Sequence, residues 1–285
     1  MKQKKCAAAV FALAAAAIFL FGGCEGKGPS VSFAESSQPL EKSGAVSSKI
    51  LVSGPGGTSS KALPAVTSEP PEADPSCLDG AVFIGDSITL KLKNYVTLKR
   101  KTDAGFFGTA QFLAAGSMGS GNALLPVGED SIHPSYNGIK DSLENNLARM
   151  NASKVYIMLG ANDLAPYGVD GAAKNLDRLV GRFLSKLPSL KVYIQSATPL
   201  LADKQMKTLN NANIEKYDSE LSDLCDERGW TYLDVASIMR DSDGSMKPEY
   251  CSDPDDLGMH FTDEACDAWI HYILTHNAEN TEVSQ

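Results

Sequence analysis

The sequence has few basic residues, few cysteines and few histidines, and each shortage narrows the range of functions. Its 26 Lys and Arg residues are outnumbered by 35 Asp and Glu residues, giving a formal net charge of -9 at pH 7. This charge repels phosphate, so we expect no nucleic-acid partner and no attachment to anionic lipid through basic residues. None of the six cysteines has the C-x-x-C spacing of a zinc or redox site, and we expect no metal and no other cofactor. Only four histidines are available as a general base.

The longest apolar run lies at the N-terminus, where three of the first five residues are lysine. The run ends at Phe21-Gly-Gly-Cys24, and this order is typical of an export signal that is short for a permanent transmembrane helix. Small residues before Cys24 resemble the lipobox of bacterial lipoproteins, although Phe21 is not the usual small aliphatic residue. We expect residues 1–24 to be the signal peptide, and Cys24 to carry a lipid that anchors the protein on the outer face of the bacterial membrane. Simple secretion and an uncleaved anchor are the alternatives.

Composition divides the rest of the chain into three parts. Residues 25–76 are rich in Ser, Pro, Gly and Ala and lack sustained apolar periodicity, which predicts a disordered tether. Residues 77–276 are long enough for one domain with a single hydrophobic core, which we expect to be monomeric. Residues 277–285 are typical of a flexible tail. A tether between a lipid and a domain would let an enzyme reach a surface-bound polymer.

Short apolar segments alternate with longer amphipathic ones within the domain. The expected strands are near-continuously apolar, as suits burial on both faces: Ala81–Ile84, Gln111–Ala115, Lys154–Leu159, Lys191–Ser196 and Trp230–Val235. Between them, apolar residues recur at helical spacing, for example at Leu176, Leu179 and Phe183. The alternation predicts an α/β fold, a three-layer α/β/α sandwich around a five-stranded parallel sheet, with its active site at the carboxyl ends of the strands.

Four cysteines remain if Cys6 leaves with the signal peptide and Cys24 carries lipid. In an exported protein they could form two disulfides by any of three connectivities, and buried free thiols are an equal alternative. The four are Cys77, Cys225, Cys251 and Cys266.

Polar motifs follow the first three expected strands, and a histidine precedes the last helix. Ser87 closes Gly85-Asp86-Ser87, Gly116 follows the second strand, and Asn162 lies in Gly160-Ala-Asn-Asp163 after the third. His260 lies in a loop before the helix around Trp269. Alone, these residues would be a helix N-cap, a loop glycine, a turn asparagine and a surface histidine.

Together, Ser87, Gly116, Asn162 and His260 have the order and spacing of one family, and the chain resembles the SGNH or GDSL hydrolases over residues 77–276. The resemblance implies a flavodoxin-like fold with Ser87 as nucleophile and His260 as the base that takes its proton. It also implies an oxyanion hole made by the N–H groups of Ser87 and Gly116 and the side chain of Asn162.

The family's last motif is Asp-x-x-His, and the chain departs from it because Leu257 stands where the acid is expected. We expect Asp256, displaced by one residue, to orient His260. Asp253, Asp255 and a backbone carbonyl remain alternatives. We expect Asp86 and Asp163 to form hydrogen bonds that build their motifs rather than to act as catalytic acids.

The resemblance implies an extracellular serine esterase. The export signal and tether favour short acyl groups, such as O-acetyl groups on a glycan or cell-surface polymer. The alternatives are a lipase, lysophospholipase or thioesterase on the same framework, an acyltransferase, and a non-catalytic glycan-binding surface lipoprotein.

Overall fold

The structure, a computed structural model, describes residues 72–276 of the chain. The predicted signal peptide with Cys24, residues 25–71 of the predicted tether and the predicted tail at 277–285 lie outside the described residues. Residues 73–76, which we assigned to the tether, belong to the fold instead. The Ala73 N–H donates to the Leu274 carbonyl at 2.9 Å, and a 3-10 helix, η1, spans Pro75–Leu78.

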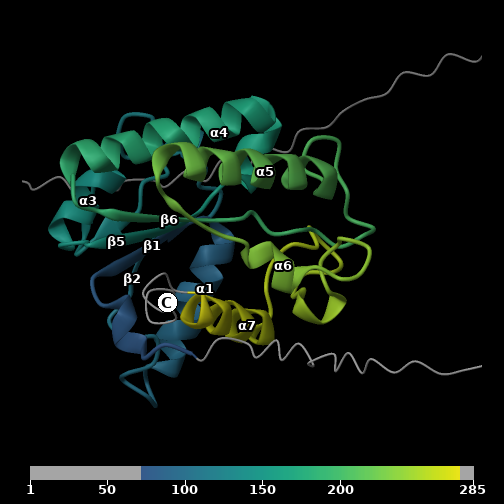
Figure 1. The fold of residues 1–285 in the computed structure, drawn as a ribbon, viewed down its shortest axis with the longest axis horizontal. Helices are drawn as coiled ribbons and strands as arrows, with labels where there is room; N and C mark the ends of the chain where they lie inside the picture. The colour runs from purple at the N-terminus through teal and green to yellow at the C-terminus, as the bar shows by residue number, and fades with distance from the viewer. Residues whose placement is uncertain (1–71, 277–285) are drawn as a thin grey trace, which may run out of the picture. The chain divides into compact units, whose positions relative to one another are not determined.

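A five-stranded parallel sheet forms the centre of the domain (Figure 1). Its strands are β1 (Ala81–Gly85), β2 (Gln111–Ala114), β5 (Lys154–Met158), β6 (Lys191–Gln195) and β7 (Thr231–Leu233). The spatial order is β2-β1-β5-β6-β7, and every pairing is parallel. The predicted α/β class and five-stranded parallel sheet are therefore confirmed, and the predicted strand boundaries agree to within two residues at each end.

The strand order places a topological switch point beside β1. From β1 the chain moves outward to β2, and then returns to pair β5 with the other edge of β1. In open α/β sheets the crevice outside the carboxyl ends of the strands at such a switch is where ligands bind. The residues that directly follow β1 and β5 therefore meet at this crevice.

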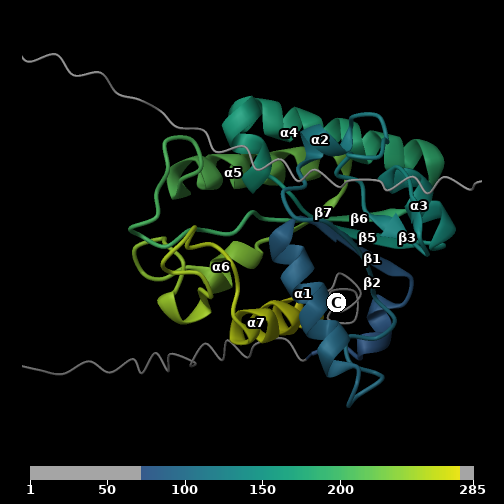
Figure 2. The ribbon, with the colours of Figure 1, turned by 180° about the vertical axis from the view of Figure 1, so that it is seen from behind.

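Helices cover both faces of the sheet. Figure 1 shows α4 and α5 on one face and α1 and α7 on the other, and Figure 2 shows α2 beside α4 from behind. The helices are α1 (Ser87–Lys99), α2 (Ser120–Ala123), α3 (Leu143–Arg149), α4 (Ala161–Lys186), α5 (Asn211–Arg228), α6 (Val235–Met239) and α7 (Asp263–Thr275). A small antiparallel pair, β3 (Ser135–Tyr136) and β4 (Ile139–Lys140), and the 3-10 helix η2 (Pro248–Tyr250) complete the elements of residues 72–276. Within residues 72–276, no helix combines the length and the apolar composition that a membrane span requires.

Buried aromatic side chains fix the sheet and the last helix. Phe83, Tyr156 and Tyr193 are register neighbours on three adjacent strands, and their rings stack at centroid distances of 4.6 and 4.4 Å. Trp269 of α7 is fully buried and donates its indole N–H to the Gln195 side chain at 2.7 Å. Because α7 is anchored to β6 in this way, the loop that carries His260 is held over the sheet.

Helix α4 is broken near its start. Pro166 lies inside it, and Gly168 has non-helical angles, with φ 66° and ψ -179°. A positive φ is readily adopted only by glycine, so Gly168 ends a first segment that begins at Ala161. This first segment contains Asn162.

The cysteines do not form the two disulfides that we considered. Cys225, Cys251 and Cys266 are buried free thiols, which agrees with the alternative prediction. Burial raises the pKa of the Cys225 and Cys266 thiols to about 12, so neither is a thiolate at neutral pH.

Candidate active site

Ser87 is the first residue of α1, directly after the turn that ends β1. The turn requires glycine at Gly85, because a Cβ there would lie 1.9 Å from Thr89 Oγ1 and 2.7 Å from the Met158 carbonyl oxygen. The Asp86 carboxylate caps the helix by accepting the Ile88 N–H at 3.0 Å. A helix does not provide a partner for the N–H of its first residue, so the Ser87 N–H can serve a ligand.

Ser87, His260 and Asp253 form a continuous chain of hydrogen bonds. Ser87 Oγ lies 2.9 Å from His260 Nε2, and His260 Nδ1 lies 2.7 Å from Asp253 Oδ2. A carboxylate only accepts, so the Nδ1–H of the neutral ring donates to Asp253 and Nε2 accepts from the Ser87 hydroxyl. The structure thus brings Ser87 and His260 together in the geometry of an activated serine.

The prediction that Asp256 orients His260 is wrong, because Asp253 occupies that position. Residues 251–261 fold back on themselves. Cys251 and Phe261 form an isolated antiparallel β-bridge, and the Ser252 N–H donates to the His260 carbonyl at 2.8 Å. Asp253 therefore faces His260 across the turn. Asp255 and Asp256 are exposed within the turn.

Asp253 is held by several donors. Its Oδ1 accepts the backbone N–H groups of Met259 and His260 at 3.0 and 2.9 Å, and Cys251 Sγ lies 3.4 Å from the same oxygen. Burial raises the pKa of this carboxyl, but the hydrogen bonds from the ring and backbone of His260 and from Cys251 lower it more, and the resulting pKa is below its usual value. Asp253 is therefore charged at neutral pH.

Asn162 lies in the first turn of α4, after the strand that pairs with β1. The preceding turn requires Gly160, which has φ 143° and whose Cβ would lie 2.2 Å from the Tyr217 ring. The Asn162 amide donates to Asp86 Oδ2 at 2.9 Å and to the Met118 carbonyl at 3.2 Å. Asn162 is thus linked to the Ser87 turn through Asp86.

Two glycines follow β2, and the structure distinguishes them. Gly116 is exposed, and a Cβ on it would meet no atom within 4 Å, so packing does not require glycine there. These observations do not test the oxyanion role of its N–H, which stays a prediction. At Gly119 a Cβ would lie 2.7 Å from the Asp163 carboxylate, so a side chain does not fit there. The sequence prediction did not include Gly119, because no local signal separates it from Gly116 in Gly116-Ser-Met-Gly119.

Asp163 and Asp86 build their motifs, as predicted. The buried Asp163 carboxylate accepts the N–H groups of Ser120 and Gly121 at 2.7 and 2.8 Å, and so ties α2 to the first turn of α4. Burial raises the pKa of Asp163, and it raises the pKa of Asp86 to about 6. Neither carboxylate is the one bonded to the His260 ring.

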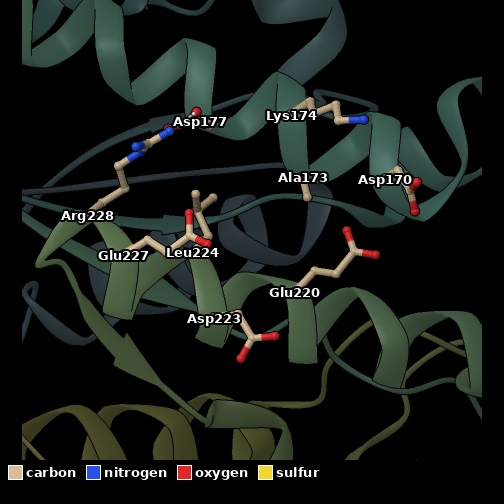
Figure 3. Close-up of a pocket in the computed structure, with 9 residues that line it drawn as sticks. All are labelled: Asp170, Ala173, Lys174, Asp177, Glu220, Asp223, Leu224, Glu227 and Arg228. Atoms are coloured by element: carbon tan, nitrogen blue, oxygen red, sulfur yellow. Dashed lines mark hydrogen bonds and ion pairs between the residues drawn. The ribbon is translucent and has the colours of Figure 1, made fainter.

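A separate groove lies between α4 and α5, and none of Ser87, Asn162 and His260 lines it (Figure 3). Its only cations among the lining residues are Lys174 and Arg228, and Figure 3 shows Arg228 directed at Asp177, with contacts of 2.9 and 2.8 Å. Its acidic residues are Asp170, Asp177, Glu220, Asp223 and Glu227. Within residues 72–276, no group of three or more His, Cys, Asp or Glu side chains is placed to hold a metal ion.

Residues 83–268, more than half of the chain, match the model of the GDSL-like Lipase/Acylhydrolase family. N-acylneuraminate cytidylyltransferase of Streptococcus agalactiae is 30% identical over 128 residues, which are 44% of this chain and 29% of that protein. The chain thus spans under a third of the length of this curated relative.

Solved structures share the fold. A GDSL-like lipase of Bacteroides thetaiotaomicron is similar with a TM-score of 0.51 and 17% identity, over 71% of this chain and 88% of that one. The lipase/acylhydrolase of Enterococcus faecalis gives a TM-score of 0.50 and 15% identity, over 68% of this chain and 93% of that one. The family match, together with the Ser87 geometry, confirms the predicted family: the chain belongs to the GDSL-like lipases and acylhydrolases.

Proposed function

We propose that the protein cleaves esters through an acyl-enzyme on Ser87. The observation that carries the proposal is the hydrogen-bonded chain from Ser87 Oγ through His260 to Asp253. His260 takes the Ser87 proton as Oγ attacks the ester carbonyl, and the imidazolium then gives that proton to the leaving alcohol. Asp253 stabilises the imidazolium and holds the ring in the tautomer that can accept the proton.

The carbonyl oxygen becomes an oxyanion during the attack. The Ser87 N–H, at the positive end of the α1 dipole, and the Asn162 amide donate to it, and each such donor typically contributes about 3 kcal/mol. In the second step His260 activates a water that attacks the acyl carbonyl, and the acid product leaves Ser87 free.

We further propose that the substrate is a short acyl ester, such as an O-acetyl group, on a bulky alcohol such as a glycan. Ser87, Asn162 and His260 are each half-buried, and the His260 side chain is 29% exposed. A bulky alcohol can therefore approach the reacting atoms from solvent. The predicted tether supports the same substrate class, because it would let the domain reach a surface polymer.

Hydrolysis of nitrophenyl esters with acyl chains of increasing length tests these proposals. We expect turnover to be greatest for acetate and to be lost in Ser87→Ala and His260→Ala, with thermal unfolding confirming that both variants fold. A maximum at long acyl chains would favour a lipase or lysophospholipase, and a preference for thioesters would favour a thioesterase. Acyl transfer to an added sugar in place of water would identify an acyltransferase. Folded protein without turnover on any ester would contradict the hydrolase proposal.

We also propose that the protein is a lipoprotein attached to the membrane through Cys24, as the sequence before it resembles a lipobox. Growth of the expressing bacterium with a radiolabelled fatty acid should label the protein in the membrane fraction. Cys24→Ser should abolish the label, whereas Cys6→Ser should leave it unchanged. Equal labelling of wild type and Cys24→Ser would contradict the anchor.

A further inference from the structure

One buried carboxylate connects the two sides of the catalytic crevice. Asp86 is 2% exposed, and its two oxygens accept from different elements. Oδ1 accepts the Ile88 N–H of α1 at 3.0 Å, and Oδ2 accepts the Asn162 amide of α4 at 2.9 Å. The helix that begins at Ser87 and the side chain proposed to bind the oxyanion are therefore joined through a single residue.

The Asn162 amide has no spare hydrogen in this state. A side-chain NH₂ group has two hydrogens, and here they have two acceptors, Asp86 Oδ2 and the Met118 carbonyl. The oxyanion can therefore receive a hydrogen bond only if one of these bonds is released. The bond to Met118 is longer, 3.2 against 2.9 Å, and its acceptor is neutral, whereas bonds to a carboxylate are about twice as strong. We therefore expect the hydrogen bond to the Met118 carbonyl to be released when the oxyanion forms.

We propose that Asp86 is a positioning residue of the reaction. Its hydrogen bond with the Asn162 amide persists during the attack, while the second amide hydrogen changes its acceptor from the Met118 carbonyl to the oxyanion. The proposal rests on the acyl-enzyme mechanism above and adds the origin of the amide's orientation. Without Asp86, the Asn162 side chain could rotate, and the donor would have to be ordered during the attack.

Asp86 can serve both partners only as a carboxylate. A proton on either oxygen turns an acceptor into a donor that faces an N–H group, so one of the two bonds is weakened. Burial raises the pKa of Asp86 to about 6, although hydrogen bonds and the charge of His260 lower it.

Charged groups on the elements around Asp86 have partners of their own. Asp163 of α4 bonds to α2, Asp253 bonds to His260, and Lys91 of α1 pairs with Asp263 at 2.5 Å. The segment 115–123 after β2 contains no charged residue. The pKa of Asp86, about 6, therefore sets the pH at which its carboxylate becomes neutral.

A double-mutant cycle on the full-length protein tests the proposal, with nitrophenyl acetate as substrate. Asp86→Asn is isosteric but can offer an acceptor to only one of its two partners. We expect it to lower kcat at least tenfold with KM changed by less than about twofold, and Asn162→Ala to lower kcat about 10² to 10³-fold. If Asp86 acts through Asn162, the double variant should lie within about threefold of Asn162→Ala alone.

The matched control is Asp218→Asn, which changes another buried carboxylate, one bonded to Ala197 and Arg240, and should leave kcat unchanged. Unchanged kcat in Asp86→Asn, or effects of Asp86→Asn and Asn162→Ala that multiply in the double variant, would overturn the proposal. Absence of ester turnover by the wild type would instead refute the proposed function.

A pH profile tests the same proposal if Asp86→Asn does not fold. In the wild type, protonation of Asp86, whose pKa is about 6, should make kcat/KM fall more steeply below pH 6 than in Asn162→Ala, where the charge of Asp86 no longer matters. The ratio of wild-type to Asn162→Ala activity should therefore decrease as pH falls through 6. A ratio that stays constant across this range would contradict the positioning role.

Discussion

Replacing Asp253 with Asn removes the negative charge next to His260 and leaves the shape of the side chain unchanged. The Asn oxygen can still accept the backbone N–H groups of Met259 and His260, which lie 3.0 and 2.9 Å from Asp253 Oδ1. The new NH₂ group then faces His260 Nδ1, 2.7 Å from the present Oδ2. Because that nitrogen must now accept, the ring is forced into the tautomer that carries its hydrogen on Nε2 and cannot take the Ser87 proton.

The size of the effect follows from the charge pair. An imidazolium and a carboxylate whose charges are about 4 Å apart attract by about 4 kcal/mol at an effective dielectric constant of 20. The His260 and Asp253 side chains are 29% and 16% exposed, so solvent screening reduces this value. A loss of about 3 kcal/mol corresponds to a decrease in kcat of about two orders of magnitude.

Steady-state hydrolysis of nitrophenyl acetate at pH 8 measures this loss. Asp256→Asn is the control, since Asp256 is exposed in the same turn, and its kcat should stay within about twofold of the wild type. If Asp256→Asn lost activity and Asp253→Asn kept it, the assignment of the acid would be refuted. Equal and full activity in both variants would show that a Ser87–His260 dyad suffices.

Two further predictions concern stability. Gly160→Ala should destabilise the protein by about 2 to 4 kcal/mol in urea unfolding, because φ is 143° and the new Cβ would lie 2.2 Å from the Tyr217 ring. Asp218→Asn should flatten the pH dependence of stability. Burial raises the folded pKa of Asp218 to about 7 from 3.8, so this residue's contribution is greatest below pH 3.8 and is lost as pH rises through 7, by about 2 to 4 kcal/mol.

Each stability prediction has a control. Gly181 lies in α4, has open space at its Cβ position and is not among the residues with positive φ, so Gly181→Ala should stabilise by about 0.5 to 1 kcal/mol. A stable Gly160→Ala would show that the turn before Asn162 adapts. For Asp218→Asn, free energies of unfolding at pH 4 and pH 8 are compared with the wild type. An unchanged difference between the two pH values would disprove the buried-charge argument.

The sheet was predictable because strands buried on both faces are near-continuously apolar, as in residues 154–159. Ser87, Asn162 and His260 were predictable because each lies directly after a strand or before a helix, where local sequence sets position. These signals are local, and each involves only a few neighbouring residues.

Asp253 was not chosen from the sequence, since the spacing of the family motif pointed to residues nearer His260. The turn that reverses the chain begins at Asp253-Pro254 and ends at Gly258, which has φ 65°. Pro and Gly are the residues that mark such turns, so this signal could have identified Asp253. Gly119 could not be identified in this way, because the atoms that exclude a side chain there belong to Asp163 of α4, 44 residues later in the chain.

The break in α4 at Gly168 has a consequence for how the site can vary. The segment 161–167 carries Asn162 and the exposed Tyr167, whereas the following helix up to Lys186 provides the buried face with Leu176 and Phe183. Because the two segments do not share one helical axis, insertions or replacements at positions 165–167 need not rotate the residues that pack in the core. The segment beside Ser87 can thus change with little effect on the orientation of the helix that packs in the core, which is one way in which a single scaffold accommodates different sites.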